Sequence, residues 1–198
     1  MKTAKQIAIV LLVILCACNS NEKTHAPKVN FGIYETINVS EIPSSILDSL
    51  KTTQIQFEEN LQQPTIGYIL KDDPLNLNVY ENEGLKLAKT ISTVDKEGKY
   101  YAVAALKPTI AIDNADIQKT KVKDLNVEIH FNLSGANKWA EVTKKNVGRN
   151  VAFVIYDRIY SMPLVNGEIR IGLAIIAGLE NDSIAKALSE SLNASIPE

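Results

Sequence analysis

Hydrophobic and polar residues alternate most regularly in the second half of the chain. Apolar residues occupy every second position from Leu125 to Leu133, a period of two that predicts a strand with one solvent-exposed face. The unbroken apolar run at 151–156 predicts a strand buried on both faces. Asp157-Arg158 and the apolar stretch that follows predict a hairpin, and the alternation at 169–175 predicts a third strand.

Two helical patterns lie among these strands. Ser134 is expected to cap a helix that buries Trp139 in its apolar stripe and ends near Gly148. A last helix begins after 181–183, with one face formed by Ile184, Ala187, Leu188, Ser191 and Leu192. The order β-α-β-β-β-α predicts an α+β fold, with the helices packed on one side of a mixed or antiparallel sheet.

The first half of the chain predicts a smaller α+β region over residues 29–99. Residues 29–34 alternate like a half-buried strand, and Pro43 opens a short helix with Ile46, Leu47 and Leu50 on one face. Further strands are expected at 65–70, 76–80, 85–91 and 100–106. The second region is then expected to cover residues 100–198.

The N-terminal segment has the pattern of a signal peptide. Lys2 and Lys5 precede an apolar run at 7–18, which is too short for the ~20 residues that span a bilayer. Leu15-Cys16-Ala17-Cys18 resembles the lipobox of bacterial lipoproteins, which implies cleavage after residue 17 and a diacylglycerol on Cys18. The polar residues that follow, up to 28, are expected to form a tether. An ordinary secretory signal or an uncleaved N-terminal anchor are the alternatives.

Composition and charge argue against several classes of function. The 198 residues carry a formal net charge of −2, so there is no basic field for a nucleic acid. Without residues 1–17 the chain has 181 residues, 19 basic and 23 acidic, and a net charge of −4. Both cysteines, Cys16 and Cys18, lie in the N-terminal segment, so neither a disulfide nor a cysteine metal site is expected in the fold.

Few residues of the chain are candidates for a catalytic role. His25 is interpreted as a solvated tether residue, and His130 as a histidine on the polar face of its strand, beside Glu128. Asp157, Ser161 and His130 could be imagined as a hydrolase triad, but Ser161 lacks the glycine pattern of a nucleophile elbow. We therefore expect no catalytic residue, no cofactor and no metal, with an enzyme as the least favoured alternative.

The second half also resembles a known family. The head subdomain of the first periplasmic domain of SecD/SecDF is similar to residues 135–143, 146–157, 159–163, 176–178 and 183–188. Residues 101–108 and 114–117 resemble the segment that leads from the base of that periplasmic domain into the head. A weaker resemblance to the base extends back to Val29, so residues 29–99 are expected to be base-like and 100–198 head-like. Two features depart from the family pattern: Arg158 replaces a usual glycine, and the loop before the third strand is shortened to 165–167. After Cys18 there is no apolar stretch of ~20 residues, so the chain is not expected to act as a proton-driven export motor by itself.

The resemblance implies a non-enzymatic binding module. We expect a lipid-anchored protein of the cell envelope that faces the periplasm, with the outer membrane favoured over the inner. Its expected partners are the membrane, through the lipid, and an unfolded or extended polypeptide or another envelope protein, in a role accessory to export or periplasmic folding. A structural envelope lipoprotein without an export role is the alternative.

Overall fold

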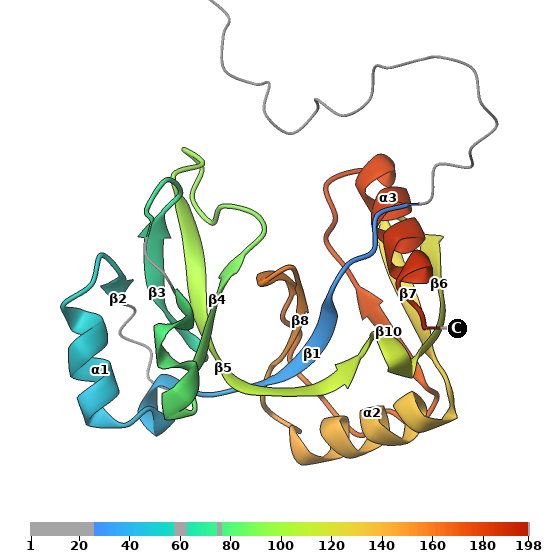
Figure 1. The fold of residues 1–198 in the computed structure, drawn as a ribbon, viewed down its shortest axis with the longest axis horizontal. Coiled ribbons are helices and arrows are strands. Elements are labelled where there is room, and N and C mark those ends of the chain that lie inside the picture. Colours follow the sequence, from blue (N-terminus) through green and yellow to red (C-terminus); the bar gives the residue numbers. More distant parts are fainter. Residues whose placement is uncertain (1–25, 58–62, 75–76, 198) are drawn as a thin grey trace, which may run out of the picture.

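The computed structural model describes residues 26–57, 63–74 and 77–197 of the chain. Cys18 and the expected signal peptide lie outside the described residues. In Figure 1, two halves flank a central group of strands, with α1, β2, β3 and β4 in one half and α2, α3, β6, β7 and β10 in the other. No helix within the described part of the chain is long and apolar enough to cross a membrane.

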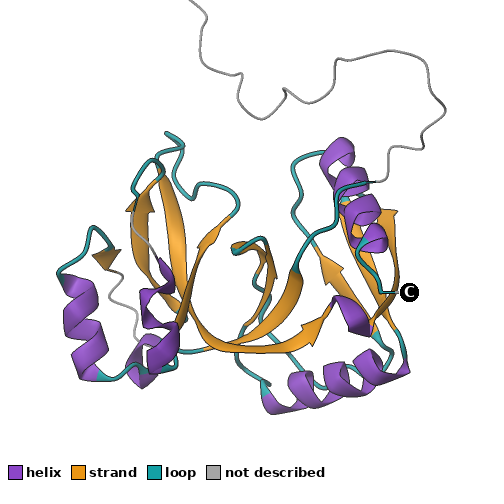
Figure 2. Cartoon of the chain, viewed as in Figure 1, coloured by secondary structure: helices purple, strands orange, loops and turns teal. Residues whose placement is uncertain are grey.

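In the described part of the chain, ten strands form two sheets, one mixed and one antiparallel. Seven strands have the order β1-β8-β9-β4-β5-β3-β2, in which β4 and β9 are parallel, and three strands have the order β10-β7-β6. Figure 2 shows the strands at the centre and the helices outside them. The strand bounds are β1 Phe31–Thr36, β2 Gln56–Phe57, β3 Thr65–Leu70, β4 Lys86–Thr90, β5 Tyr100–Asp113, β6 Ile117–Lys123, β7 Asn126–Phe131, β8 Val151–Ile155, β9 Arg158–Ser161 and β10 Leu173–Ile176.

The helices are short and amphipathic. Their bounds are α1 Ser44–Lys51, α2 Leu133–Lys145 and α3 Asp182–Ala194, with 3₁₀ turns at Val39–Glu41, Leu77–Glu83 and Asn114–Asp116. Trp139 of α2 and Leu188 and Leu192 of α3 share one core with β1, β7 and β8. The predicted α+β class and the order β-α-β-β-β-α are confirmed, and α3 covers the three-stranded sheet.

Five strands of the larger sheet close into a ring, because β1 pairs with β8 on one side and with β5 on the other. Three alanines, Ala88, Ala104 and Ala152, pack in one cluster with larger side chains such as Tyr34 and Leu106, which suits the narrow space inside a five-stranded ring. Lys86 lies on the same face of β4 as Ala88 and is 6% exposed. Its Nζ is 2.9 Å from Asp157 Oδ1 and 3.0 Å from Glu81 Oε1, so two carboxylates offset the burial of this charge.

Strand β5 lies in the second expected region but pairs with three strands of the first. It begins at Tyr100 and pairs with β3 and β4 at its start and with β1 towards its end. Strands from residues 29–99 and 100–198 therefore share one sheet. That residues 29–99 and 100–198 are separate domains stays a prediction.

Several sequence predictions need correction. Strand β1 is not half-buried, because Phe31 and Ile33 face the main core while Tyr34 faces the ring interior. The strand expected at 76–80 is wrong, since Leu77–Glu83 is a 3₁₀ helix. The third strand, expected at 169–175, is limited to Leu173–Ile176, where it pairs with β7.

The helix expectations also shift by a few residues. Asn132 caps α2 in place of Ser134, with its side chain accepting from the Gly135 N–H at 2.9 Å. In α3, Ala187 is exposed, whereas Ala185 and Ser189 join Leu188 and Leu192 in the buried face. Leu125 and Leu133, expected to point inward, are 44% and 81% exposed because both lie beyond the ends of β7.

Candidate functional site

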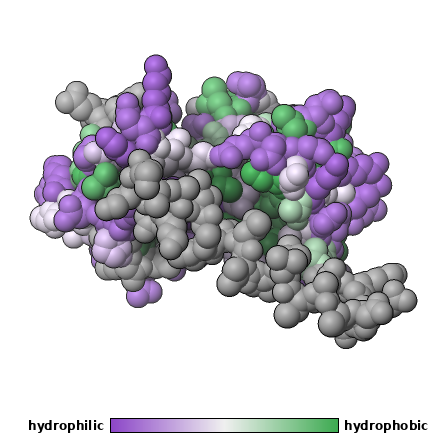
Figure 3. Space-filling view, turned by 90° about the horizontal axis from the view of Figure 1, so that it is seen from above, coloured by the Kyte–Doolittle hydropathy of each residue, from purple (hydrophilic) through white to green (hydrophobic). Residues whose placement is uncertain are grey.

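A groove lies between the two halves of the molecule. Strand β9 forms its floor, residues 90–94 after β4 form one wall, and residues 178–184 at the start of α3 form the other. Seen from above, the surface is hollowed between the halves and hydrophobic side chains gather in the hollow (Figure 3). We call this feature the interlobe groove.

The groove exists because β4 and β9 pair over only two residue pairs. Lys89 is opposite Arg158 and Thr90 is opposite Ile159, after which the Ile91 N–H donates to the Ile159 carbonyl at 2.9 Å. The chain then turns towards β5, where the Val94 N–H donates to the Tyr100 carbonyl. Strand β9 continues to Ser161, and no described strand pairs with that end on the β4 side. A short strand edge is thus open at the floor of the groove.

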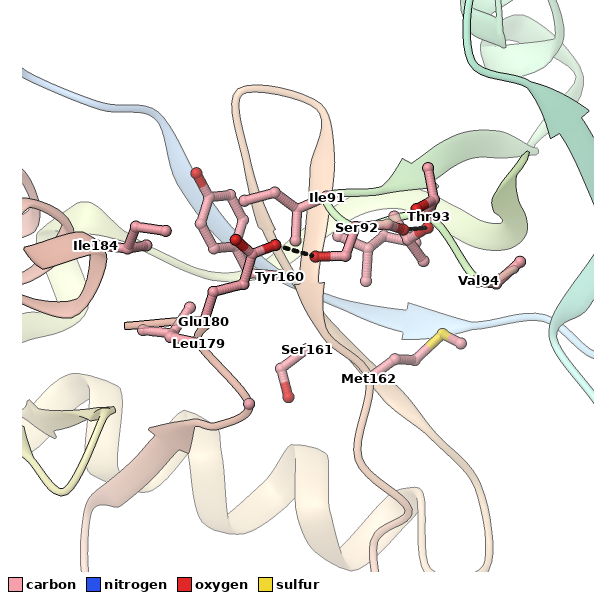
Figure 4. A pocket seen from close by; sticks show the side chains of 13 residues that line it. Ile91, Ser92, Thr93, Val94, Tyr160, Ser161, Met162, Leu179, Glu180 and Ile184 are labelled. Carbon is pink, nitrogen blue, oxygen red and sulfur yellow. Dashed lines mark hydrogen bonds between the residues drawn. The ribbon is translucent and has the colours of Figure 1, made fainter. Parts of the chain in front are cut away.

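The lining of the groove is mostly apolar. Ile91 and Val94 are 37% and 52% exposed, while Ile159 and Leu179 form a buried base. The volume is about 420 Å³, within the range of ~300–1,000 Å³ that ligand pockets occupy. Figure 4 shows the lining side chains, which are those of Thr90, Ile91, Ser92, Thr93, Val94, Ile159, Tyr160, Ser161, Met162, Leu179, Glu180 and Ile184, together with Gly178.

Polar groups of the groove satisfy one another across and along its walls. The Ser92 hydroxyl donates to Glu180 Oε1 at 3.4 Å, which joins the two walls (Figure 4). The Thr90 hydroxyl donates to the Ser92 carbonyl and accepts from the Ala102 N–H, which fixes the bend after β4. Burial, with a smaller contribution from the charge of Tyr156, raises the pKa of Tyr160, so its phenol stays neutral in the groove.

The structure does not bring the imagined catalytic residues together. Ser161 lies in the groove, Asp157 pairs with Lys86 at the end of the strand ring, and His130 lies on β7 in the other sheet. His130 Nε2 is 3.4 Å from Glu128 Oε2, so the predicted same-face neighbour is confirmed. Since these three residues have separate neighbours, the arrangement offers no nucleophile with an adjacent base.

Metal-ligating groups are dispersed. Within the described residues, no three His, Cys, Asp or Glu side chains lie close enough to hold a metal ion. The groove can therefore act through apolar contact, hydroxyl groups and one carboxylate. Such a lining is suited to binding a polypeptide by its side chains and backbone.

Sequence reasoning reached only part of this site. Residues 159–163, 176–178 and 183–188 belong to the family resemblance, whereas Leu179 and Glu180 do not. The wall at 90–94 is interpreted from the sequence as a strand end and a connection. The signal that could have identified it is Val94, an apolar residue in the otherwise polar connection Ser92-Thr93-Val94-Asp95. An apolar residue in a polar loop is informative only after the fold shows what it faces.

Comparisons with known proteins agree with the sequence resemblance. The family model described as SecDF, P1 head subdomain matches residues 89–196. The chain is 31% identical over 106 residues to the protein translocase subunit SecD of Rhodothermus marinus and 26% identical over 185 residues to that of Rickettsia prowazekii. These matches cover 50% and 89% of this chain, but it spans only 17% and 33% of those relatives. A crystal structure of SecDF in the super-membrane-facing form is similar over 86% of this chain and 19% of that chain, with a TM-score of 0.49 and 19% identity.

Proposed function

Because the chain belongs to the SecDF P1 head subdomain family, we propose that it is a non-enzymatic binding module that holds an extended segment of polypeptide in the interlobe groove. The relatives are named as protein translocase subunits, and a related structure is described as a membrane component that enhances protein export. A role accessory to protein export or periplasmic folding fits these relatives.

The observation that carries this proposal is the open edge of β9 beneath an apolar groove. An extended peptide can add its backbone hydrogen bonds to a free strand edge, while neighbouring apolar pockets receive alternate side chains. Ser161 ends β9 on the groove floor, and Ile91 and Val94 present exposed apolar surface on the wall that follows β4. A free strand edge and apolar surface for side chains are therefore both present in the interlobe groove.

A binding titration tests the proposal. Fluorescence anisotropy of a labelled, unfolded apolar peptide is measured against the full chain, its Val94→Asp variant and a Leu70→Asp control. Leu70 is 48% exposed and Val94 52%, so both substitutions place a charge on similarly exposed positions, but only Val94 lines the groove. We expect binding in the micromolar range, a loss of about tenfold or more for Val94→Asp, and little change for Leu70→Asp. No binding at tens of micromolar, or equal losses in both variants, contradicts the proposal.

A lipid anchor at Cys18 is the second part of the proposed function. It is supported by the apolar run at 7–18 and by the polar stretch that precedes the fold. The chain enters the fold at Val29, whose N–H donates to the Ser195 hydroxyl at 2.6 Å. An anchored chain would thus hold the domain on a tether of about ten residues, on the periplasmic side of a membrane.

Mass spectrometry of the protein extracted from envelopes tests the anchor. We expect a mature N-terminus at Cys18 that carries acyl chains, and a Cys18→Ser variant that keeps its leader and loses the acylation. Sucrose-gradient fractionation of the same material would assign the protein to the outer or the inner membrane. An unacylated mature N-terminus elsewhere in the segment contradicts the lipid anchor while leaving the groove proposal intact.

A further inference from the structure

The groove carries one charged side chain among its thirteen lining residues. This residue is Glu180, and the others are apolar, carry a hydroxyl group, or are Gly178. Figure 4 shows Glu180 reaching from its loop towards Ser92 on the opposite wall. A carboxylate is therefore held over apolar surface, where water that screens its charge is displaced when a ligand enters.

The Glu180 carboxylate has no cationic partner within the described part of the chain. Its hydrogen bond is the long one from the neutral Ser92 hydroxyl, at 3.4 Å. Two basic residues that lie close in sequence to groove residues have other partners. Lys186 forms an ion pair with Asp182, and Arg158 stacks on the Tyr101 ring at 4.8 Å. A basic group that enters the groove therefore meets an available carboxylate.

We infer that the groove selects extended apolar segments that carry a lysine or arginine at one end, and that Glu180 is the residue that makes this selection. This inference rests on the proposed function and adds a specificity to it. The cation exchanges the weak Ser92 contact for an ion pair with the Glu180 carboxylate, while the apolar side chains pack against Ile91, Val94 and Met162. A segment with an acidic end is disfavoured because two carboxylates would approach each other beside apolar surface.

The experiment compares three labelled peptides that share one apolar core and end in Lys, Gln or Glu. Each is titrated against the full chain and against the Glu180→Gln and Glu180→Lys variants by fluorescence anisotropy. Glu190→Gln is the matched control, because Glu190 is an exposed acid of α3 outside the groove lining. We expect the Lys peptide to bind about two- to fivefold more tightly than the Gln peptide, as for an ion pair of partly exposed groups.

The variants separate the possible outcomes. Glu180→Gln should abolish the preference, Glu180→Lys should reverse it, and Glu190→Gln should keep it. The preference should also shrink between about 0.1 M and about 1 M salt, as the screening length falls from ~10 to ~3 Å. Equal binding of the three peptides, or loss of the preference in Glu190→Gln, overturns the selection by Glu180 while the groove proposal stands. If no peptide binds, the proposed function itself fails.

Discussion

The side-chain amide of Asn193 closes the free edge of the three-stranded sheet at Thr120. The Thr120 N–H donates to Asn193 Oδ1 at 2.7 Å, and Asn193 Nδ2 donates to the Thr120 carbonyl at 3.3 Å. In addition, the Thr120 hydroxyl donates to the Ser189 carbonyl at 2.9 Å. One residue of α3 thus supplies the hydrogen bonds that a further strand would supply to β6.

We predict that Asn193→Ala lowers the free energy of unfolding by about 1–2 kcal/mol, because two partly buried hydrogen bonds are lost and the Thr120 backbone is left without them. Urea unfolding, followed by the fluorescence of the buried Trp139, measures the change. Asn137→Ala is the control, since Asn137 is exposed on α2. Equal stability of the two variants would show that the Asn193 amide contributes nothing to the edge.

The turn between β6 and β7 should become more stable when Leu125 is replaced by glycine. Asp124 and Leu125 have φ values of +48° and +64°, the left-handed conformation required at both central positions of a type I′ turn. Leu125 lacks compensating burial, so Leu125→Gly should raise the free energy of unfolding by about 1 kcal/mol. Leu125→Ala keeps the unfavourable φ and should give no gain. A destabilised glycine variant in thermal unfolding would contradict this reasoning.

A glycine inside α2 should resist replacement by alanine despite the higher helix propensity of alanine. A Cβ atom on Gly135 would lie 2.3 Å from the Asp116 carbonyl oxygen, a backbone atom of the preceding 3₁₀ turn. The clash should cost about 1–3 kcal/mol, more than the ~1 kcal/mol that alanine gains over glycine in a helix. Calorimetry of Gly135→Ala should therefore show a lower melting temperature, and an increase would refute the close approach.

Stability should fall in acid partly through Glu35, which joins β1 to two lysines. Burial acts to raise the pKa of Glu35, but hydrogen bonds from Lys107 at 2.7 Å and Lys145 at 3.0 Å outweigh it and lower the pKa overall. A lowered carboxyl pKa contributes stability that is complete above the unfolded value of about 4.5 and is lost as the pH falls through the folded pKa.

Glu35→Gln should cost up to about 1 kcal/mol at pH 7 and should weaken the loss of stability below pH 4.5, because its amide does not titrate. Urea unfolding from about pH 7 to about pH 3 measures both effects against the control Glu190→Gln, a change at an exposed acid of α3. Parallel pH profiles for the wild type and Glu35→Gln would exclude this contribution.

Local patterns predicted the elements whose residues are buried in a regular order. The alternation around Ile129 predicts β7, and the apolar run at 151–156 predicts β8. In both strands the buried side chains are the apolar ones that the pattern marks. Strand β6 was not predicted, because its sequence Ile117–Lys123 contains three lysines. It is also stabilised by hydrogen bonds to α3, which lies more than sixty residues later in the sequence. Edge strands rich in lysine look like loops until their partner is known.

The site was less predictable than the fold for the same reason. Ser92 and Glu180 are separated by 88 residues in sequence, and the groove arises where β4 and β9 stop pairing. Where two strands part depends on long-range packing and turn geometry, which no local period encodes. Of the groove residues, the family resemblance covers the β9 floor, Gly178 and Ile184, but neither Ser92 nor Glu180.

Closure of the strand ring also affects the order in which contacts form during folding. Phe31 pairs with Ile155, and β1 is the strand that joins β8 to β5, so the first strand of the fold finds a partner more than one hundred residues later. Contacts of such high sequence separation slow folding, because the long loop must be ordered before they form. In a chain that emerges N-terminus first, β1 can pair with β5 as soon as residue 113 has followed, but the ring closes only after β8 has emerged. Ring closure is then expected to be a late step when the domain is synthesised or transported from its N-terminus.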